Sequence, residues 1–166
     1  MLRINPATAL LLLTDLRQLE PGDWVIQNVG NSGVGRWVML LAQQMGLRTV
    51  NVVRRQSLFA EMYSLGADVC VVDGPELAAR VRAETGQQPI GLALDAVGGQ
   101  ATSRLASCVA DGGLVCHYGT MSGEDPLVPR STSRIAGCTS PVSCSGASCR
   151  GARWTRSPKP TRGLPG

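Results

Sequence analysis

A glycine-rich segment, Gly30-Asn31-Ser32-Gly33-Val34-Gly35, has the residue types and spacing of an anion-binding turn. It follows the apolar run Trp24 to Val29 and precedes a stretch with helical spacing of apolar residues. Glycines at such a turn let the chain reverse tightly, bring backbone N–H groups close to a pyrophosphate and let the helix pack closely on the strand. The segment predicts a dinucleotide site, although Ser32 replaces the middle glycine of the usual pattern. A turn with a purely steric role is the alternative.

Two arginines follow the next expected strand, in the segment Arg54-Arg55-Gln56, about 20 residues beyond the turn. A site that prefers NAD places an acidic residue here, where it binds the ribose hydroxyls. Guanidinium groups instead grip a 2′-phosphate through charge-assisted, bidentate hydrogen bonds. We therefore expect NADPH rather than NADH, against the alternative that Arg54 and Arg55 are ordinary solvated charges.

Alternating strands and helices must position these two segments. Apolar runs bounded by glycine or proline predict strands, and apolar residues at helical spacing predict helices, the first beginning at Asn5-Pro6. The expected strands are 24–29, 49–53, 69–72, 91–95 and 113–118, and the expected helices are 5–18, 34–45, 58–65, 75–84 and 100–109. Strands separated by helices form a parallel sheet with helices on both faces. We therefore expect an α/β, doubly wound, Rossmann-like sheet of about five strands.

Two further segments end strands on the same edge as the glycine turn. They are Asp95-Ala96-Val97-Gly98-Gly99 and His117-Tyr118-Gly119-Thr120-Met121. Ligands of open α/β sheets bind at that carboxyl edge. A single histidine at the end of a buried strand is more often a packed or surface residue than a catalyst, and the same holds for Tyr118. We therefore predict no catalytic residue.

Charge is distributed unevenly along the chain. Met1 to Pro126 carries nine basic and twelve acidic residues, whereas Leu127 to Gly166 carries seven basic and no acidic ones. After Pro129 the sequence is rich in Ser, Gly, Arg, Pro and Cys, shows neither strand nor helix period, and predicts disorder. We therefore divide the chain into a nucleotide-binding domain, 1–128, and a disordered basic tail, 129–166. Such a tail binds polyanions weakly and without sequence preference, so no specific nucleic acid is expected as a partner.

Six cysteines and one histidine set the redox and metal chemistry available. Three cysteines lie in apolar runs and are expected to be buried, reduced thiols: Cys70, Cys108 and Cys116. The other three lack C-x-x-C spacing, so no metal site is expected: Cys138, Cys144 and Cys149. No stretch approaches the roughly 20 apolar residues that span a bilayer, and no membrane partner is expected.

Four segments of the sequence occur together in one family. They are Asn5-Pro6-Ala7-Thr8-Ala9, Leu19-Glu20-Pro21-Gly22-Asp23-Trp24-Val25-Ile26-Gln27-Asn28, Asn31-Ser32-Gly33-Val34-Gly35 and Leu47-Arg48-Thr49-Val50-Asn51-Val52-Val53-Arg54. Through them the chain resembles the mitochondrial 2-enoyl thioester reductases, zinc-free members of the medium-chain dehydrogenase/reductase superfamily. The resemblance covers Asn5 to about Val128. It is more generic at Ser64-Leu65-Gly66-Ala67-Asp68, which much of the superfamily shares.

In that family NADPH delivers hydride to the β-carbon of a trans-2-enoyl acyl thioester, in fatty acid synthesis, and a proton is added at the α-carbon. The resemblance implies cofactor contacts at the glycine turn and at three other places. The full expected cofactor-binding set is Asn5, Gly30, Asn31, Ser32, Gly33, Val34, Gly35, Arg54, Arg55, Gln56, Tyr118, Gly119, Thr120 and Met121. The family commonly has an acidic residue at Arg55, an arginine at Gln56 and a glycine at Thr120, and these departures should retune the affinity for the cofactor.

The resemblance also implies parts that the similar region lacks. The family's GroES-like catalytic domain would precede Met1, and its sixth strand would follow Val128. We therefore expect a fragment that is inactive alone and meets its acyl thioester substrate only together with the missing domain. Dimerisation is doubtful, because the sixth strand pairs subunits in this superfamily. The family is mitochondrial, but Met1 to Arg17 does not resemble a transit peptide, which favours the cytoplasm for a chain starting at Met1.

Two other functions remain open. A quinone oxidoreductase of the same superfamily shares the glycine turn and the Leu-Gly-Ala-Asp segment. A non-catalytic nucleotide-binding or interaction module would use the positive charges of the tail to contact nucleic acid or an anionic membrane.

Overall fold

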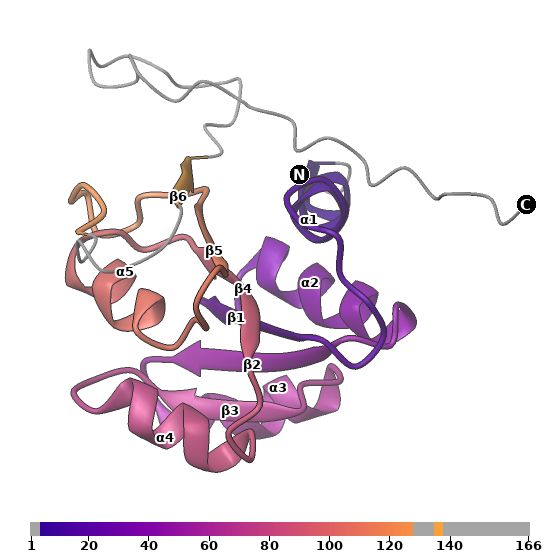
Figure 1. Ribbon diagram of the computed structural model, residues 1–166, viewed down its shortest axis with the longest axis horizontal. Coiled ribbons are helices and arrows are strands. Elements are labelled where there is room, and N and C mark those ends of the chain that lie inside the picture. Colours follow the sequence, from indigo (N-terminus) through magenta and orange to yellow (C-terminus); the bar gives the residue numbers. More distant parts are fainter. Residues whose placement is uncertain (1–3, 128–134, 138–166) are drawn as a thin grey trace, which may run out of the picture.

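The computed structural model describes residues 4–127 and 135–137, which form one parallel sheet flanked by helices (Figure 1). The strands are β1 (Trp24–Asn28), β2 (Arg48–Val53), β3 (Val69–Val72), β4 (Ile90–Asp95), β5 (Leu114–His117) and β6 (Ile135–Gly137). The helices are α1 (Ile4–Thr14), α2 (Gly33–Gln44), α3 (Phe59–Ser64), α4 (Leu77–Glu84) and α5 (Gly99–Ala106), with a short 3-10 helix, η1 (Gln56–Leu58).

The strand order of the sheet is β3-β2-β1-β4-β5-β6, and every neighbouring pair is parallel. Strands β1 to β3 are added outward in one direction, and β4 to β6 are added outward in the other. An open α/β sheet binds its ligands beyond the carboxyl ends of the strands, at such a switch point. The ends of β1 and β4 are therefore where this fold offers a ligand site.

Helices cover both faces of the sheet. Side chains of α1, α2 and α3 pack on one face, and side chains of α4 and α5 pack on the other. The neighbours Val25 and Ile26 on β1 are both buried and belong to the clusters on opposite faces. Because both faces are covered, the strands are continuous apolar runs rather than alternating ones.

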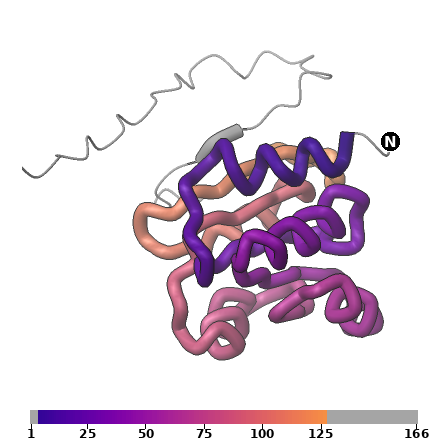
Figure 2. The backbone as a smooth tube through the Cα atoms, turned by 90° about the vertical axis from the view of Figure 1, so that its right-hand side faces the viewer, coloured from indigo at the N-terminus to yellow at the C-terminus, as the bar shows by residue number. Residues whose placement is uncertain are grey.

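Helix α1 precedes the first strand in the sequence but packs against α2, as Figure 2 shows. Its buried residues Leu12 and Leu13 join the same apolar cluster as Leu92 and Leu94 of β4. Burial of each leucine is worth roughly 1.5–3 kcal/mol. Helix α1 thus covers the part of this face that α2 leaves open, and its first turn carries Asn5 to the glycine turn.

The expected α/β doubly wound sheet is confirmed, and β3 has the predicted bounds. Helix α1 ends at Thr14 rather than at residue 18. Helix α4 begins at Leu77 rather than at Pro75, because Glu76 has a left-handed backbone with φ +59°, which interrupts the helical path. Within the part of the chain described, no helix is long and apolar enough to cross a membrane.

The predicted sheet of about five strands is confirmed, and the structure adds one short strand at its edge. Residues Ile135–Gly137 pair in parallel with Val115–His117 of β5, in a segment for which no strand was predicted. The free edge of β5 offers backbone N–H and C=O groups, which a short segment satisfies without a periodic pattern of its own. The expectation that dimerisation is doubtful stays a prediction. The rest of the predicted tail, including Cys138, Cys144 and Cys149, lies outside the described residues, and the boundary after residue 128 stays a prediction.

Candidate functional site

The glycine turn connects the carboxyl end of β1 to the start of α2. Strand β1 ends at Asn28 and α2 begins at Gly33. Between them Val29 takes a left-handed backbone with φ +56°, and its carbonyl accepts a hydrogen bond from the Ser32 N–H at 2.9 Å. The left-handed position of this turn is thus held by a valine rather than by a glycine. The N-terminus of α2 lies at the carboxyl edge of the sheet, as an anion site requires.

Close backbone packing requires one glycine of the turn, Gly35, whereas Gly33 lies against the side chain of Asn5. A Cβ at Gly35 would lie 2.6 Å from Val29 O and 2.8 Å from both Cα and O of Gly30, which are backbone atoms with little freedom to move. A Cβ at Gly33 would collide with the side-chain amide nitrogen of Asn5. Gly35 therefore allows the helix to approach the strand, and Gly33 allows α1 to approach the turn.

Ser32 is the N-cap of α2. Its Oγ accepts a hydrogen bond from the Gly35 N–H at 3.0 Å, and its carbonyl accepts one from the Arg36 N–H at 3.0 Å. The N–H groups of Gly33 and Val34 make no hydrogen bond within residues 4–127 and 135–137. Two open N–H groups at a helix start, aligned with the helix dipole, attract an anion.

A buried amide network holds the turn in place from below. Gln27 Nε2 donates to Gly35 O at 3.0 Å and to Asn51 Oδ1 at 2.7 Å. Both side chains are 0% exposed, so these bonds are made in a low-dielectric interior. They connect β1, β2 and the first turn of α2. This network was not predicted from the sequence, because nothing in a strand pattern indicates which polar residue points under a helix.

Arg54, Arg55 and Gln56 lie at the carboxyl end of β2, beside the turn, and all three are exposed. Within the part of the chain described, neither arginine side chain forms an ion pair or a hydrogen bond. Arg36 of α2, in contrast, pairs with Glu61 of α3. The two guanidinium groups are therefore free to contact an anion at the end of β2.

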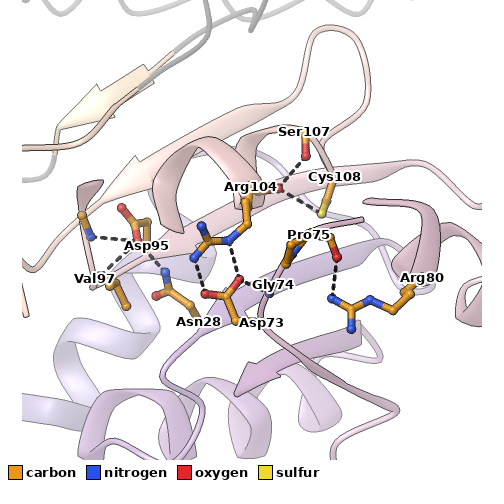
Figure 3. Close-up of polar contacts among 11 residues, drawn as sticks. Asn28, Asp73, Gly74, Pro75, Arg80, Asp95, Val97, Arg104, Ser107 and Cys108 are labelled. Carbon is orange, nitrogen blue, oxygen red and sulfur yellow. Dashed lines mark hydrogen bonds and ion pairs between the residues drawn. The ribbon is translucent and has the colours of Figure 1, made fainter. Parts of the chain in front are cut away.

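At the switch point the buried carboxylate of Asp95 is the centre of a second polar network (Figure 3). Asn28 Nδ2 donates to Asp95 Oδ1 at 2.5 Å, which joins the ends of β1 and β4. Thr102 Oγ1 of α5 donates to Oδ2 at 2.6 Å, and His117 Nδ1 of β5 lies 2.7 Å from the same oxygen. The backbone N–H of Val97 donates to Oδ1 at 3.0 Å. One carboxylate thus ties three strands and a helix together.

These hydrogen bonds decide the charge of Asp95. Burial alone would raise the pKa of its carboxyl group, but the hydrogen bonds from Thr102, Asn28 and His117 outweigh burial and lower the pKa. Asp95 is therefore a buried anion. The sequence analysis noted both Asp95 and His117 as ends of strands but did not pair them, because their contact depends on β4 and β5 being neighbours.

The segment from Tyr118 to Met121 lies along the end of β4. Tyr118 N–H donates to Asp95 O at 2.8 Å, and Met121 N–H donates to Ala96 O at 3.0 Å. Gly119 has no room for a larger residue without displacement, since its Cβ would lie 3.3 Å from Ala96 O. Thr120 and Met121 are exposed.

Tyr118 itself points away from this edge. Its ring packs into the cluster under α1 and α2, and its hydroxyl is buried without a hydrogen-bond partner in the described part of the chain. Burial raises the pKa of the phenol, and the Asp95 and Cys116 charges raise it further. Of the four expected contact residues here, Tyr118 therefore offers its backbone rather than its side chain.

A separate open cleft of about 290 Å³ is lined by Pro75, Gln100, Ser103 and Arg104. Arg104 makes a two-point contact with Asp73, with Nε at 2.8 Å and Nη2 at 2.6 Å from the two carboxylate oxygens (Figure 3). No residue of the glycine turn or of the Arg54 segment lines this cleft. We therefore do not include it in the candidate site.

Metal ligands do not gather in the described part of the chain. No group of three or more His, Cys, Asp or Glu side chains that could hold a metal ion occurs within residues 4–127 and 135–137. Cys70, Cys108 and Cys116 are buried, as expected. Burial raises the pKa of the Cys70 and Cys108 thiols to about 11.

Comparison with known proteins gives a family and several relatives. The sequence model of the family described as zinc-binding dehydrogenase matches residues 33–152. The mitochondrial enoyl-[acyl-carrier-protein] reductase of Dictyostelium discoideum is 41% identical over 133 residues, which is 77% of this chain and 38% of that protein. The enzyme of the same name from Homo sapiens is 40% identical over 132 residues, 76% of this chain and 35% of that protein. The chain thus spans little more than a third of these relatives.

Several solved structures are similar in fold to this chain, and two of them are of Etr1p or a heterodimer that contains it. Etr1p in complex with NADP and crotonyl-CoA has a TM-score of 0.72 at 26% identity, covering 80% of this chain and 40% of that one. The mitochondrial 2-enoyl thioester reductase Etr1p/Etr2p heterodimer from Candida tropicalis has a TM-score of 0.72 at 27% identity, covering 79% and 40%. A NADPH:quinone reductase from Bacillus thuringiensis, its function described as putative, has a TM-score of 0.70 at 26% identity, covering 76% and 38%.

Proposed function

The chain belongs to the zinc-binding dehydrogenase family, and from this membership we propose that it is the NADPH-binding part of an oxidoreductase that reduces trans-2-enoyl acyl thioesters. The observation that carries the proposal is the start of α2, where two open N–H groups lie at the switch point beside two unpaired arginines. The family name refers to zinc, but the described residues contain no ligand set for it, and no step is assigned to a metal.

Two groups on the carboxyl edge would hold the phosphates of the cofactor. The N–H groups of Gly33 and Val34 bind the pyrophosphate. Arg54 and Arg55 bind the 2′-phosphate, since guanidinium groups form charge-assisted, bidentate contacts with phosphate. The other expected members of the site flank these groups: Asn5, Gly30, Asn31, Ser32, Gly35, Gln56, Tyr118, Gly119, Thr120 and Met121.

The order of the strands sets the direction in which NADPH lies. With the 2′-phosphate at the end of β2 and the pyrophosphate at the end of β1, the nicotinamide half extends over the ends of β4 and β5. Gly119 lies close to Ala96, just beyond the end of β4, at this edge. When bound, the cofactor supplies a hydride, and the chain's own residues bind and orient it.

Substrate reduction is proposed for the longer protein and not for this chain alone. The relatives named enoyl-[acyl-carrier-protein] reductase extend well beyond the region that this chain covers. We assign cofactor binding to the chain and substrate binding to the part of the relatives that it does not span. Hydride transfer needs the substrate held in a productive pose, which the described residues do not provide. By the same relatives we propose a mitochondrial location.

A quinone as the second substrate is the alternative that the Bacillus thuringiensis neighbour supports. An activity assay can distinguish the two candidate substrates if it uses a version of the chain extended to the length of its relatives. Turnover of a crotonyl thioester with NADPH supports the first proposal, and turnover of a quinone alone supports the second.

The test of cofactor binding uses the chain as it stands. NADPH and NADH are titrated separately while nucleotide fluorescence and the melting temperature are followed. We expect NADPH to bind more tightly and to stabilise the protein more, because ligand binding to the folded state raises its melting temperature. Equal stabilisation by both would remove the role of Arg54 and Arg55, and binding of neither would overturn the proposed function.

A further inference from the structure

His117 is the single histidine of the chain and connects the buried Asp95 to the surface of the candidate site. Its Nδ1 lies 2.7 Å from Asp95 Oδ2, and its Nε2 lies 3.3 Å from the hydroxyl of the exposed Thr120. The His117 side chain is 14% exposed and that of Asp95 is 0% exposed. A proton taken up by His117 therefore changes the charge next to a buried anion.

The pair has two charge states, which differ by one proton on His117. When His117 is protonated, its positive charge and the negative charge of the Asp95 carboxylate sum to zero. With His117 neutral, the pair carries one negative charge. In a partly buried environment such a charge is screened less than in water, and it attracts a nearby cation.

The pair lies at the ends of β4 and β5. The cofactor pose proposed above would place the nicotinamide half, which is the half that changes charge, over these strand ends. The nicotinamide ring is neutral in NADPH and cationic in NADP⁺. We propose that the Asp95–His117 pair is a proton-linked discriminator of the cofactor's redox state: protonated His117 favours NADPH, and neutral His117 favours NADP⁺. This inference rests on the proposed function, because it requires the cofactor to bind as described above.

Among the described residues, other titratable and charged groups around His117 do not imitate this switch. Tyr118, which follows β5, stays neutral because burial raises the pKa of its phenol, and Cys116 on β5 is a buried thiol. Helix α5 contributes Arg104, whose charge is paired with Asp73. The loop over the start of α5 contributes Glu124, whose carboxylate lies against Gly99.

Breaking the contact between His117 and Thr120 should leave the fold intact. The segment after β5 is already held by backbone hydrogen bonds to the segment after β4, including Ser122 N–H to Val97 O at 2.9 Å and Gly99 N–H to Asp125 O at 3.1 Å. Side-chain changes at His117 therefore change charge more than backbone position.

The experiment measures the affinities of the whole chain for NADPH and NADP⁺ from about pH 6 to about pH 8, on either side of the usual histidine range. The ratio of the two dissociation constants, NADP⁺ over NADPH, should fall about fivefold or more as pH rises, the lower end of typical coupling between sites. Ionisation of the 2′-phosphate cancels in this ratio because both forms carry it.

A second measurement tests the same coupling from the other side. Because the chain has one histidine, NMR of labelled histidine follows His117 without ambiguity. Coupling is reciprocal, so saturating NADP⁺ should move the His117 titration midpoint to lower pH than saturating NADPH, by the same factor as the affinity ratio.

Two variants separate charge from hydrogen bonding. His117→Gln keeps a polar partner for Asp95 but cannot be protonated, so its affinity ratio should be independent of pH. Thr120→Val keeps both ionisable groups and should retain the pH dependence, whatever its effect on the two affinities. If both cofactors bind but their ratio does not change with pH, or the His117 midpoint is equal in the two complexes, the discriminator is refuted and the proposed function stands. If neither binds at any pH, both fail.

Discussion

Substituting Gly35 by alanine tests whether the close approach of α2 to β1 creates the candidate site. The new Cβ would lie 2.6 Å from Val29 O and 2.8 Å from Cα and O of Gly30, closer than real Cβ contacts. These are backbone atoms, so relief requires α2 to move away from the turn. Overpacking of this kind costs about 1–3 kcal/mol. The loss of backbone freedom in the unfolded chain returns about 0.4–1 kcal/mol, so we expect a net loss of about 1–2 kcal/mol.

That loss corresponds to a fall in melting temperature of about 3–10 °C for a domain of this size. The assay is thermal unfolding followed by circular dichroism, together with NADPH titration, and we expect affinity to fall because the open N–H groups of Gly33 and Val34 move with the helix. Gly91→Ala is the matched control: its Cβ would meet only Arg17 Nε at 3.4 Å, an ordinary contact with a flexible side chain. If Gly35→Ala melts and binds like the control, the argument from close packing is refuted.

Three further predictions concern single groups of the site. Replacing Arg54 and Arg55 together by glutamine should weaken NADPH binding by about tenfold or more while leaving NADH binding nearly unchanged, since charge-assisted hydrogen bonds are worth about 1.5–3 kcal/mol; parallel titrations check this, and equal weakening of both would contradict it. Ser32→Ala should lower the free energy of unfolding by about 1 kcal/mol through loss of the N-cap, whereas Ser32→Thr should retain most of it; denaturant unfolding measures both, and equal loss in the two variants would argue against capping. Asp95→Asn should cost about 2–4 kcal/mol, because a buried network loses its ionic acceptor. The folded-state pKa of Asp95 is lowered, so its stabilisation is present above about pH 4, the unfolded value, and is lost as pH falls through the folded pKa. The gap between wild type and Asp95→Asn in melting temperature should therefore narrow in acid, and a gap that stays constant down to the lowest folded pH would be inconsistent with an ionised Asp95.

Much of the fold could be predicted from short stretches of sequence. The run Val69–Val72 was predicted at its observed bounds, and the helix predicted at 34–45 is α2, which ends at Gln44 shortly before Gly46 with its φ of +71°. These features depend on neighbours within a few residues, namely on apolar periodicity and on which residue tolerates a left-handed turn. The expected position of the glycine turn was confirmed for the same reason.

Residues far apart in sequence make the contacts that could not be predicted in this way. Asn28 and Asp95 are separated by 67 positions, and Gln27 and Asn51 by 24. Each pair meets only because β1 lies between β2 and β4, an order that no local pattern states. The orientation of the Tyr118 ring could not be predicted either, because the local sequence does not indicate whether the ring faces the ligand edge or the core.

By itself, then, the sequence determined the alternation of strands and helices, the turn that opens α2, and the arginines that follow β2, because periodicity, turn chemistry and charge act over short range. Only the tertiary structure decided that a valine holds the left-handed position of the turn, that β6 extends the sheet, and that Asp95 and His117 form a pair. The physical reason is that burial and strand order act on the whole chain, and they choose which polar groups share a buried space.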